Sequence, residues 1–245
     1  MNSESLIQYS RKGHTALLIL DAPHRNALTP GFADALVDAL QRAEAEPDAT
    51  AVVLASAGPT FCSGADLGML AEVGPDPLAE EHFEGIGRIY SMFERLRDAR
   101  LPTVAAVNGA VAGAGVNLAL ACDMRIAADD VRVVGFGRAG VHPGGGHLAM
   151  LTRQLGPGAG AALALFGQEI RADRAVVSGF AWEVVPTARL RERALEVAAA
   201  AGTDGALARI LVRTYRAVEE TQPNPRAAVL MERAAQVWSL RRRAR

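Results

Sequence analysis

The chain has 245 residues, 50% of them hydrophobic, and a formal net charge of −1. A chain of this length can bury a sizeable core of its own, so a globular protein is expected. The near-neutral charge provides no basic field that would attract nucleic acid. The nearest approach to a membrane span, residues 101–122, is rich in glycine and contains Pro102 and Asn108, so no spanning segment is predicted.

The cysteines and the N-terminal residues indicate the compartment. Cys62 and Cys122 lie in different segments without CxxC spacing, which favours a reducing environment. Residues 1–10 include acidic and polar residues and lack the apolar stretch of a secretory signal. We therefore expect a cytoplasmic protein with neither nucleic acid nor membrane as its partner.

Strand-like and helix-like segments alternate along the first part of the chain. Residues 15–20 and 51–55 predict strands, and between them Thr29 can cap a helix whose first turn holds Pro30. A polar stretch with glycine and proline follows over residues 58–77. The alternation continues with helices over 80–98 and 114–122 and strands over 103–107, 124–127 and 132–134. This order predicts an α/β core with largely parallel strands.

The pattern beyond residue 146 is mainly helical. One strand-like run, residues 182–185, interrupts it. The last part, residues 204–240, is helical with a break at residues 223–225, where two prolines stand close together.

Two glycine-rich turns, residues 61–67 and residues 108–118, lie where strands give way to helices. Small side chains let a ligand approach the backbone, and the start of a helix leaves N–H groups without intrahelical partners. Two such donors that point at one place would form an oxyanion hole. Each turn taken alone is explained better by tight turning and close helix packing.

Other chemistries lack their motifs in this chain. Gly113-Ala114-Gly115 is followed by Leu118 where a dinucleotide-binding fingerprint needs glycine or alanine, and no GxxxxGK[ST] phosphate loop occurs. A GxSxG nucleophile elbow and an HExxH metal helix are also missing. No metal site is expected.

Four segments carry a family resemblance: residues 25–28 (RNAL), 61–67 (FCSGADL), 102–123 (ending in ACD) and 140–146 (GVHPGGG). Their order and separations resemble the signatures of the crotonase (enoyl-CoA hydratase/isomerase) superfamily. The resemblance covers about residues 5–240. It implies an α/β fold with a crotonase-like ββα-superhelix core over residues 1–190 and a C-terminal helical trimerisation region over residues 191–245. A homotrimer or a dimer of trimers is therefore expected.

The resemblance also implies roles for particular positions. The backbone N–H groups of Ala65 and Ala114 would hold the thioester carbonyl as the catalytic oxyanion donors. Coenzyme A, as part of the substrate and not as a separate cofactor, would lie along the first turn near Arg25, Ala27, Ser63, Ala65, Asp66 and Leu67. Asp66 could equally cap its own helix.

Two positions depart from the family pattern. Where a hydratase holds water between two glutamates, this chain has Asn117 and Phe136. Asn117 can orient a water or a substrate oxygen through its amide and so is a candidate catalytic residue, but it cannot take a proton. Phe136 can do neither. Hydration by the usual two carboxylates is therefore not expected, nor is the isomerase route that depends on the second glutamate.

A replacement base could come from either of two places. One is a set of acids that also fits a solvated helix face: Glu72, Asp76, Glu80, Glu81 and Glu84. The other is His142, which is expected in the turn after the strand that holds Phe136 and could exchange a proton near pH 7. A metal pair with His147 is conceivable, but a hydrogen bond within its own turn is the simpler interpretation for His142.

Three functions remain open at this point. The first is an enzyme that acts on an acyl-CoA through an enolate, as an isomerase, a decarboxylase or a thioester hydrolase. The second is a non-catalytic acyl-CoA-binding protein. The third is a conventional enoyl-CoA hydratase whose acids have been misaligned. The sequence does not indicate the length of the acyl chain.

Overall fold

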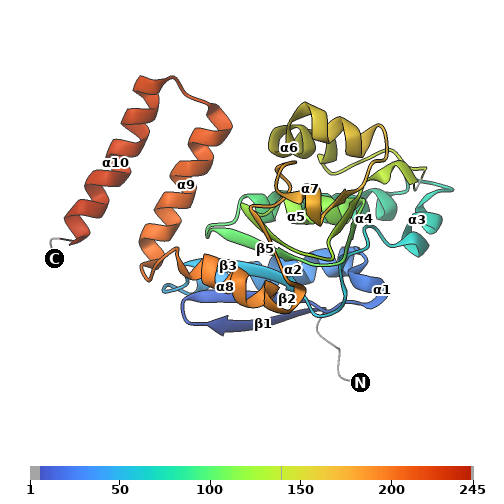
Figure 1. Cartoon of the computed structure of the whole chain (residues 1–245), viewed down its shortest axis with the longest axis horizontal. Coiled ribbons are helices and arrows are strands. Elements are labelled where there is room, and N and C mark those ends of the chain that lie inside the picture. The colour runs from blue at the N-terminus through green and yellow to red at the C-terminus, as the bar shows by residue number, and fades with distance from the viewer. Residues whose placement is uncertain (1–5, 139, 244–245) are drawn as a thin grey trace.

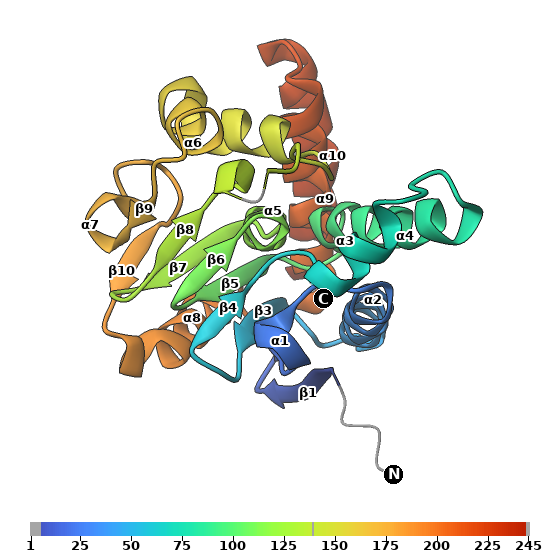
Figure 2. The same cartoon turned by 90° about the vertical axis from the view of Figure 1, so that its right-hand side faces the viewer.

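The computed structural model describes residues 6–138 and 140–243. The larger sheet of this described chain has six strands in the order β1-β2-β3-β5-β7-β10 (Figures 1 and 2). β1 is antiparallel to β2, and the other neighbours are parallel. The strands are Ile7–Lys12 (β1), Thr15–Leu20 (β2), Ala51–Ser56 (β3), Thr103–Val107 (β5), Met124–Ala128 (β7) and Glu183–Val185 (β10).

A smaller sheet determines where the two glycine-rich turns lie. Its described strands, in sheet order, are Thr60–Cys62 (β4), Ala110–Ala112 (β6), Arg132–Val134 (β8) and Ile170–Arg171 (β9). β4 and β6 are parallel neighbours, and each is followed by a glycine-containing turn and a helix. Because parallel neighbours end at the same edge of a sheet, the fold brings both turns to one place.

Helices cover both faces of the larger sheet. On one face Leu17, Val53 and Ile126 pack with Leu190 and Ala194 of α8. On the opposite face the other strand residues join the main core with α2, α4 and α5. Successive strand residues point to opposite faces, so a strand that is buried on both faces must be apolar throughout. This explains the continuous apolar runs of β2, β3 and β5.

The N-cap signal at Thr29 is confirmed. Thr29 Oγ1 accepts a hydrogen bond from Phe32 N–H at 3.1 Å, and Pro30 occupies the first turn of α2. The helices of the described chain are Pro23–Asn26 (α1), Pro30–Ala45 (α2), Leu67–Val73 (α3), Glu80–Arg97 (α4), Ala114–Leu120 (α5), His147–Ala164 (α6), Ala172–Ala175 (α7), Leu190–Ala199 (α8), Gly205–Thr221 (α9) and Pro225–Arg243 (α10), with 3-10 turns Phe136–Arg138 (η1) and Thr187–Arg189 (η2).

The structure differs from the sequence prediction in three places. Residues 7–12, which were left unassigned, form the edge strand β1, whose polar side chains face outward. Residues 58–77 are not one loop but contain β4 and α3, which are too short to show a clear periodicity. Phe136 lies in the 3-10 turn η1 and not at the end of a strand.

The C-terminal helices α9 and α10 form a hairpin that projects from the rest of the chain (Figure 1). The break predicted at residues 223–225 lies between them. α8 packs on the larger sheet, so the first helix beyond residue 190 contacts the core directly. The boundary between a core over residues 1–190 and a C-terminal helical region over residues 191–245 therefore stays a prediction. Of the helices in the described residues, none is both long enough and apolar enough to cross a membrane.

Candidate functional site

The first glycine-rich turn is held in an unusual backbone conformation between β4 and α3. Gly64 has a φ of 95°, and a Cβ placed on it would lie 2.7 Å from the Ala112 carbonyl oxygen. Its carbonyl accepts a hydrogen bond from Leu28 N–H at 2.8 Å. Asp66 caps α3, because its Oδ1 accepts from Met69 N–H at 2.9 Å. Glycine is therefore required here, and the capping role considered for Asp66 is confirmed.

The second turn presents the start of α5 to the first. Gly113 has a φ of 50°, and its N–H donates to Val134 at 2.9 Å, which ties the turn to β8. The Cβ position of Gly64 lies only 3.5 Å from Ala114 N. The two turns are therefore in direct contact.

The N–H groups of the two predicted oxyanion donors have no hydrogen-bond acceptor within the described part of the chain. Among the described residues, neither the N–H of Ala65 nor that of Ala114 donates to a protein acceptor. Ala114 is the first residue of α5, so the lack of an intrahelical partner follows from helix geometry, and the helix dipole favours negative charge at this end. Both N–H groups are therefore available to an acceptor from outside the chain, and they belong to two turns that contact each other.

The residues expected along the CoA path meet at the same turn. Ser63 N–H donates to the Arg25 carbonyl at 3.0 Å, and Ser63 Oγ donates to the His24 carbonyl at 2.9 Å. Arg25 and Leu67 are exposed, whereas Ala27 is buried. The structure thus brings Arg25 and Ser63 together and leaves the Arg25 and Leu67 side chains open to solvent.

Asn26 supports this loop, a role that the sequence interpretation did not assign. His24, Arg25 and Asn26 all have positive φ, which is unfavourable for residues other than glycine. The Asn26 side chain compensates, because its Nδ2 donates to the Thr60 and Phe61 carbonyls at 3.2 and 3.0 Å. Its presence in the RNAL motif was the available signal. Asn26 therefore fastens the strained loop to β4.

Asn117, one turn into α5 from Ala114, is fully buried and fully hydrogen-bonded. Its Nδ2 donates to the Gly144 carbonyl at 2.9 Å and, more weakly, to the Gly145 carbonyl at 3.4 Å. Its Oδ1 lies 2.6 Å from Nδ1 of His147. The amide therefore already has partners from the turn that precedes α6.

His147 is the residue of this site that the sequence interpretation missed, since it was weighed only as a metal ligand. Its side chain is buried, and burial lowers its pKa from 6.5 to about 4. Its Nε2 has no hydrogen-bond partner among the described residues. The Phe136 ring packs edge-on against the imidazole, with centroids 4.7 Å apart. The signal that could have found it is the histidine directly after three glycines, at the start of a helix.

The other residues considered as replacement bases differ from Asn117 and His147 because they are exposed to solvent. The acids considered as replacements are all solvent-exposed, as a solvated helix face requires: Glu72, Asp76, Glu80, Glu81 and Glu84. His142 is also exposed, and its Nδ1 lies 2.7 Å from the Pro143 carbonyl oxygen, within its own turn. No group of three or more potential metal ligands occurs within the described part of the chain.

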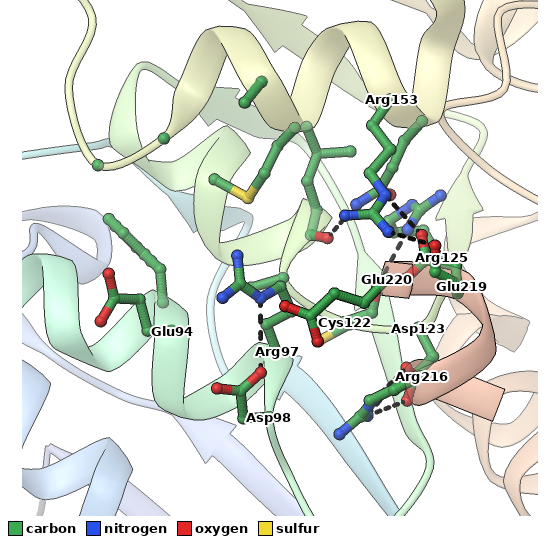
Figure 3. A pocket seen from close by; sticks show the side chains of 18 of the residues that line it. Glu94, Arg97, Asp98, Cys122, Asp123, Arg125, Arg153, Arg216, Glu219 and Glu220 are labelled. Carbon is green, nitrogen blue, oxygen red and sulfur yellow. Dashed lines mark hydrogen bonds and ion pairs between the residues drawn. The ribbon is translucent and has the colours of Figure 1, made fainter. Parts of the chain in front are cut away.

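A cavity of about 610 Å³ adjoins the turn that Asn117 contacts. Its inner wall includes Tyr90 and Phe93 of α4, Gly145 and Gly146 of the turn, and Met150 of α6. The rest of the lining is strongly charged (Figure 3) and contains the ion pairs Arg97–Asp98, Arg153–Glu219 and Arg216–Asp123 at 3.5, 2.6 and 2.8 Å. The cavity is therefore apolar near the turn and polar toward α9.

Comparison with known proteins gives a consistent family. The family model described as enoyl-CoA hydratase/isomerase matches residues 11–233. The chain is 46% identical over 173 residues to Probable enoyl-CoA hydratase EchA14 of Mycobacterium tuberculosis, a match that covers 69% of this chain and 65% of that protein. It is 30% identical to Enoyl-CoA hydratase EchA19 of the same organism, over 88% of this chain and 80% of the relative.

Solved structures show the same fold. An enoyl-CoA hydratase from Polaromonas sp. JS666 superposes with a TM-score of 0.86 at 29% identity, covering 96% of this chain and 91% of that one. An enoyl-CoA hydratase from Bacillus anthracis gives a TM-score of 0.83 at 27% identity, covering 94% and 89%. The mixed α/β architecture is therefore the crotonase fold, as the sequence predicted.

Proposed function

This chain belongs to the enoyl-CoA hydratase/isomerase family, and we propose that it binds an acyl-CoA thioester with its carbonyl oxygen between the N–H groups of Ala65 and Ala114. The observation that carries this proposal is the contact between the two turns, together with the lack of any acceptor for either N–H group among the residues that the structure describes. A thioester carbonyl gains negative charge when an enolate forms next to it. Two fixed donors can then stabilise the enolate by several kcal/mol, on the order of 3 for each donor.

The reaction in this proposal is enolate chemistry other than hydration by two carboxylates. Asn117 cannot transfer a proton, and its amide is engaged by Gly144, Gly145 and His147. Phe136 offers an apolar ring at the second position. A water activated between two acids has no counterpart in these side chains. Isomerisation, decarboxylation and thioester hydrolysis all pass through states that the same two donors would stabilise.

CoA in this proposal lies along the first turn, near the exposed side chains of Arg25 and Leu67 and beside Ser63 and Asp66. The buried Ala27 would serve as a small backbone contact. The apolar end of the cavity, at Tyr90 and Phe93, offers space for an acyl group. A homotrimer or a dimer of trimers, built through the C-terminal helices, is the assembly that we propose.

The curated Mycobacterium relative, of which the match spans 65% of the length, is named a probable enoyl-CoA hydratase. This name favours hydration as the second candidate function. Hydration in this chain would need a base other than the residues at positions 117 and 136. A binding protein without turnover is the third candidate.

One titration separates these functions. Purified protein is mixed with crotonyl-CoA, with acetoacetyl-CoA and with a long-chain acyl-CoA, while binding heat and the enoyl absorbance are followed. We expect binding heat without rapid loss of the enoyl absorbance. Rapid hydration of crotonyl-CoA would overturn the interpretation of Asn117 and Phe136. Lack of heat with every thioester would reject the acyl-CoA site itself.

A double variant, Asn117→Glu with Phe136→Glu, tests whether adding the two carboxylates is enough to produce hydration. Restored hydration in this variant would mean that the two missing carboxylates are the only barrier. We expect little gain, because a carboxylate at position 117 would face the Gly144 and Gly145 carbonyl oxygens, which cannot donate a hydrogen bond.

A further inference from the structure

The orientation of the Asn117 amide follows from its acceptors. The Gly144 and Gly145 carbonyl oxygens can only accept hydrogen bonds, so the atom that faces them at 2.9 and 3.4 Å must be the NH₂ group. The amide oxygen is therefore the atom that faces His147. Because an amide oxygen can only accept, Nδ1 of His147 must carry the hydrogen in the 2.6 Å contact.

This fixes the state of the whole imidazole. A neutral ring with its hydrogen on Nδ1 has a lone pair on Nε2, and burial keeps the ring neutral at pH 7 by lowering its pKa to about 4. The Nε2 atom is buried and accepts no hydrogen bond from any described residue. A buried acceptor without a protein partner calls for a donor from outside the chain.

The imidazole also lies beside the oxyanion turn. Phe136 connects the two, because its ring is 4.7 Å from the His147 ring centroid and 3.8 Å from the Cβ position of Gly113, the residue before Ala114. Asn117 makes a second connection, one turn along α5 from Ala114. His147 is therefore linked to the oxyanion turn through two residues, by a hydrogen bond to Asn117 and by a ring contact with Phe136.

We propose that Nε2 of His147 is the proton-transferring group of this site, and that Asn117 is a positioning residue that fixes its tautomer. This inference rests on the proposed acyl-CoA site. In the step, the C–H bond next to the thioester carbonyl breaks and the proton moves to Nε2. The electron pair forms the enolate, which Ala65 and Ala114 hold, and the imidazolium then returns a proton to carbon. No further reactant is needed.

An arrangement in which an amide side chain orients a histidine is a known way to prepare a base for catalysis. A histidine that served packing alone would be expected to have both ring nitrogens satisfied, since an unpaired buried acceptor costs stability. The unpaired Nε2 is the feature that a purely structural role leaves unexplained.

The test follows exchange of the α-protons of butyryl-CoA in deuterated buffer by proton NMR, with binding heat measured on the same samples. We expect wild-type protein to catalyse exchange and His147→Gln to lose at least about a hundredfold in rate while it still binds. Glutamine keeps a donor for Asn117 but cannot take a proton. His142→Gln is the matched control, because His142 is exposed and its Nδ1 contacts the Pro143 carbonyl within its own turn, and the exchange rate of this variant should equal that of wild type.

The outcomes separate this inference from the proposed function. Absence of binding heat in wild type would reject the acyl-CoA site. Binding without exchange in wild type, or unchanged exchange in His147→Gln, would overturn the role of His147 and leave the binding site standing. Added imidazole should restore exchange to His147→Ala, and a failure of this rescue in folded protein that binds acyl-CoA would count against a proton-transfer role.

A measurement on wild-type protein tests the proposal independently of the folding of any variant. Nitrogen-15 NMR of the His147 ring should show a protonated Nδ1 and an unprotonated Nε2 in the free protein. The Nε2 resonance should move when acetoacetyl-CoA binds, because the nitrogen gains a partner. An Nε2 resonance that is unaffected by a ligand whose binding is seen calorimetrically would contradict the proposal.

Discussion

The candidate site has two halves, one formed by main-chain groups and the other by side chains. The backbone half consists of the turns around Gly64 and Gly113, whose N–H groups at Ala65 and Ala114 belong to the main chain. The side-chain half consists of Asn117, Phe136 and His147. In the backbone half, sheet pairing and φ angles position the donors, and almost any small residue can occupy positions 65 and 114. In the side-chain half, each substitution changes the chemistry directly.

In the proposed function, this difference would let a chain of the family fold keep the two backbone donors without the two acids of a hydratase. The turns are held by β4, β6 and β8, so they persist as long as the sheet forms. The Asn117 side chain, in contrast, belongs to a hydrogen-bonded unit with Gly144 and His147. In the proposed function, recognition and reaction therefore rest on separable parts of the structure, and the following variants affect one part or the other.

The largest effect is expected for Gly64→Ala in the backbone half. The φ of 95° and the 2.7 Å approach to the Ala112 carbonyl leave no room for a methyl group, so the turn must move. We expect the free energy of unfolding to fall by about 2–4 kcal/mol and the affinity for acetoacetyl-CoA to fall about tenfold or more. Urea unfolding and calorimetric titration measure the two quantities.

Gly13→Ala is the matched control for this variant. Gly13 also has a positive φ, of 60°, but no atom lies within 4 Å of its Cβ position. It should lose only about 1 kcal/mol of stability and should bind acetoacetyl-CoA as wild type does. Equal loss of affinity in the two variants would contradict the view that the Gly64 turn itself positions a donor.

Asn117→Ala in the side-chain half should follow in size. The substitution removes the amide that bonds Gly144, Gly145 and His147, and leaves a buried imidazole N–H without an acceptor. We expect a loss of about 2–3 kcal/mol in unfolding free energy, with acyl-CoA affinity reduced far less than in Gly64→Ala. Asn108→Ala offers a comparison, since Asn108 is also buried and bonds Gly58 and Ser56. A loss of affinity as large as that of Gly64→Ala would break the distinction between the halves.

The pH dependence of stability isolates His147. Its pKa in the folded chain, about 4, lies below the ordinary value of 6.5, so the unfolded chain binds the proton more readily between these values. The stability of the neutral buried ring is fully present above about pH 6.5 and is lost as the pH falls toward 4. We expect the unfolding free energy of wild type to fall over this range by on the order of 2 kcal/mol more than that of His147→Gln.

Parallel pH curves for wild type and His147→Gln would contradict a buried neutral His147. The comparison between the two proteins cancels the titration of the carboxyl groups that they share. Urea unfolding at intervals from pH 4 to pH 7 supplies the curves. Because His147 belongs to the side-chain half, acetoacetyl-CoA affinity at pH 7 should change little in the variant.

The sequence predicted where the two turns lie, after β4 and β6, whereas the oxyanion role of Ala65 and Ala114 stays a prediction. Gly64 and Gly113 stand at strand ends in recognisable segments, so local patterns sufficed to find the turns. The contact between Asn117 and His147 joins residues 30 positions apart, through a turn whose path no periodicity specifies. Phe136 was assigned to a strand, but it lies in a 3-10 turn. Such contacts depend on tertiary packing, which local patterns do not determine.

The smallest effect is expected for Asp66→Ala, at the border between the two turns and the proposed CoA path. Asp66 Oδ1 caps α3 through Met69 N–H, and loss of an N-cap costs about 1 kcal/mol. Asn224→Ala removes a similar cap from α10, where Asn224 Oδ1 accepts from Ala227 N–H at 3.1 Å, and it serves as the control because Asn224 is not among the proposed CoA contacts. If Asp66 only caps its helix, both variants should lose similar stability and neither should lose affinity for acetoacetyl-CoA.

If Asp66 also contacts CoA, Asp66→Ala alone should bind a few-fold more weakly, by about 0.5–1 kcal/mol, because a single exposed polar contact contributes little. A loss of tenfold or more would place a side chain among the principal binding groups of the backbone half and would break its definition as a main-chain site.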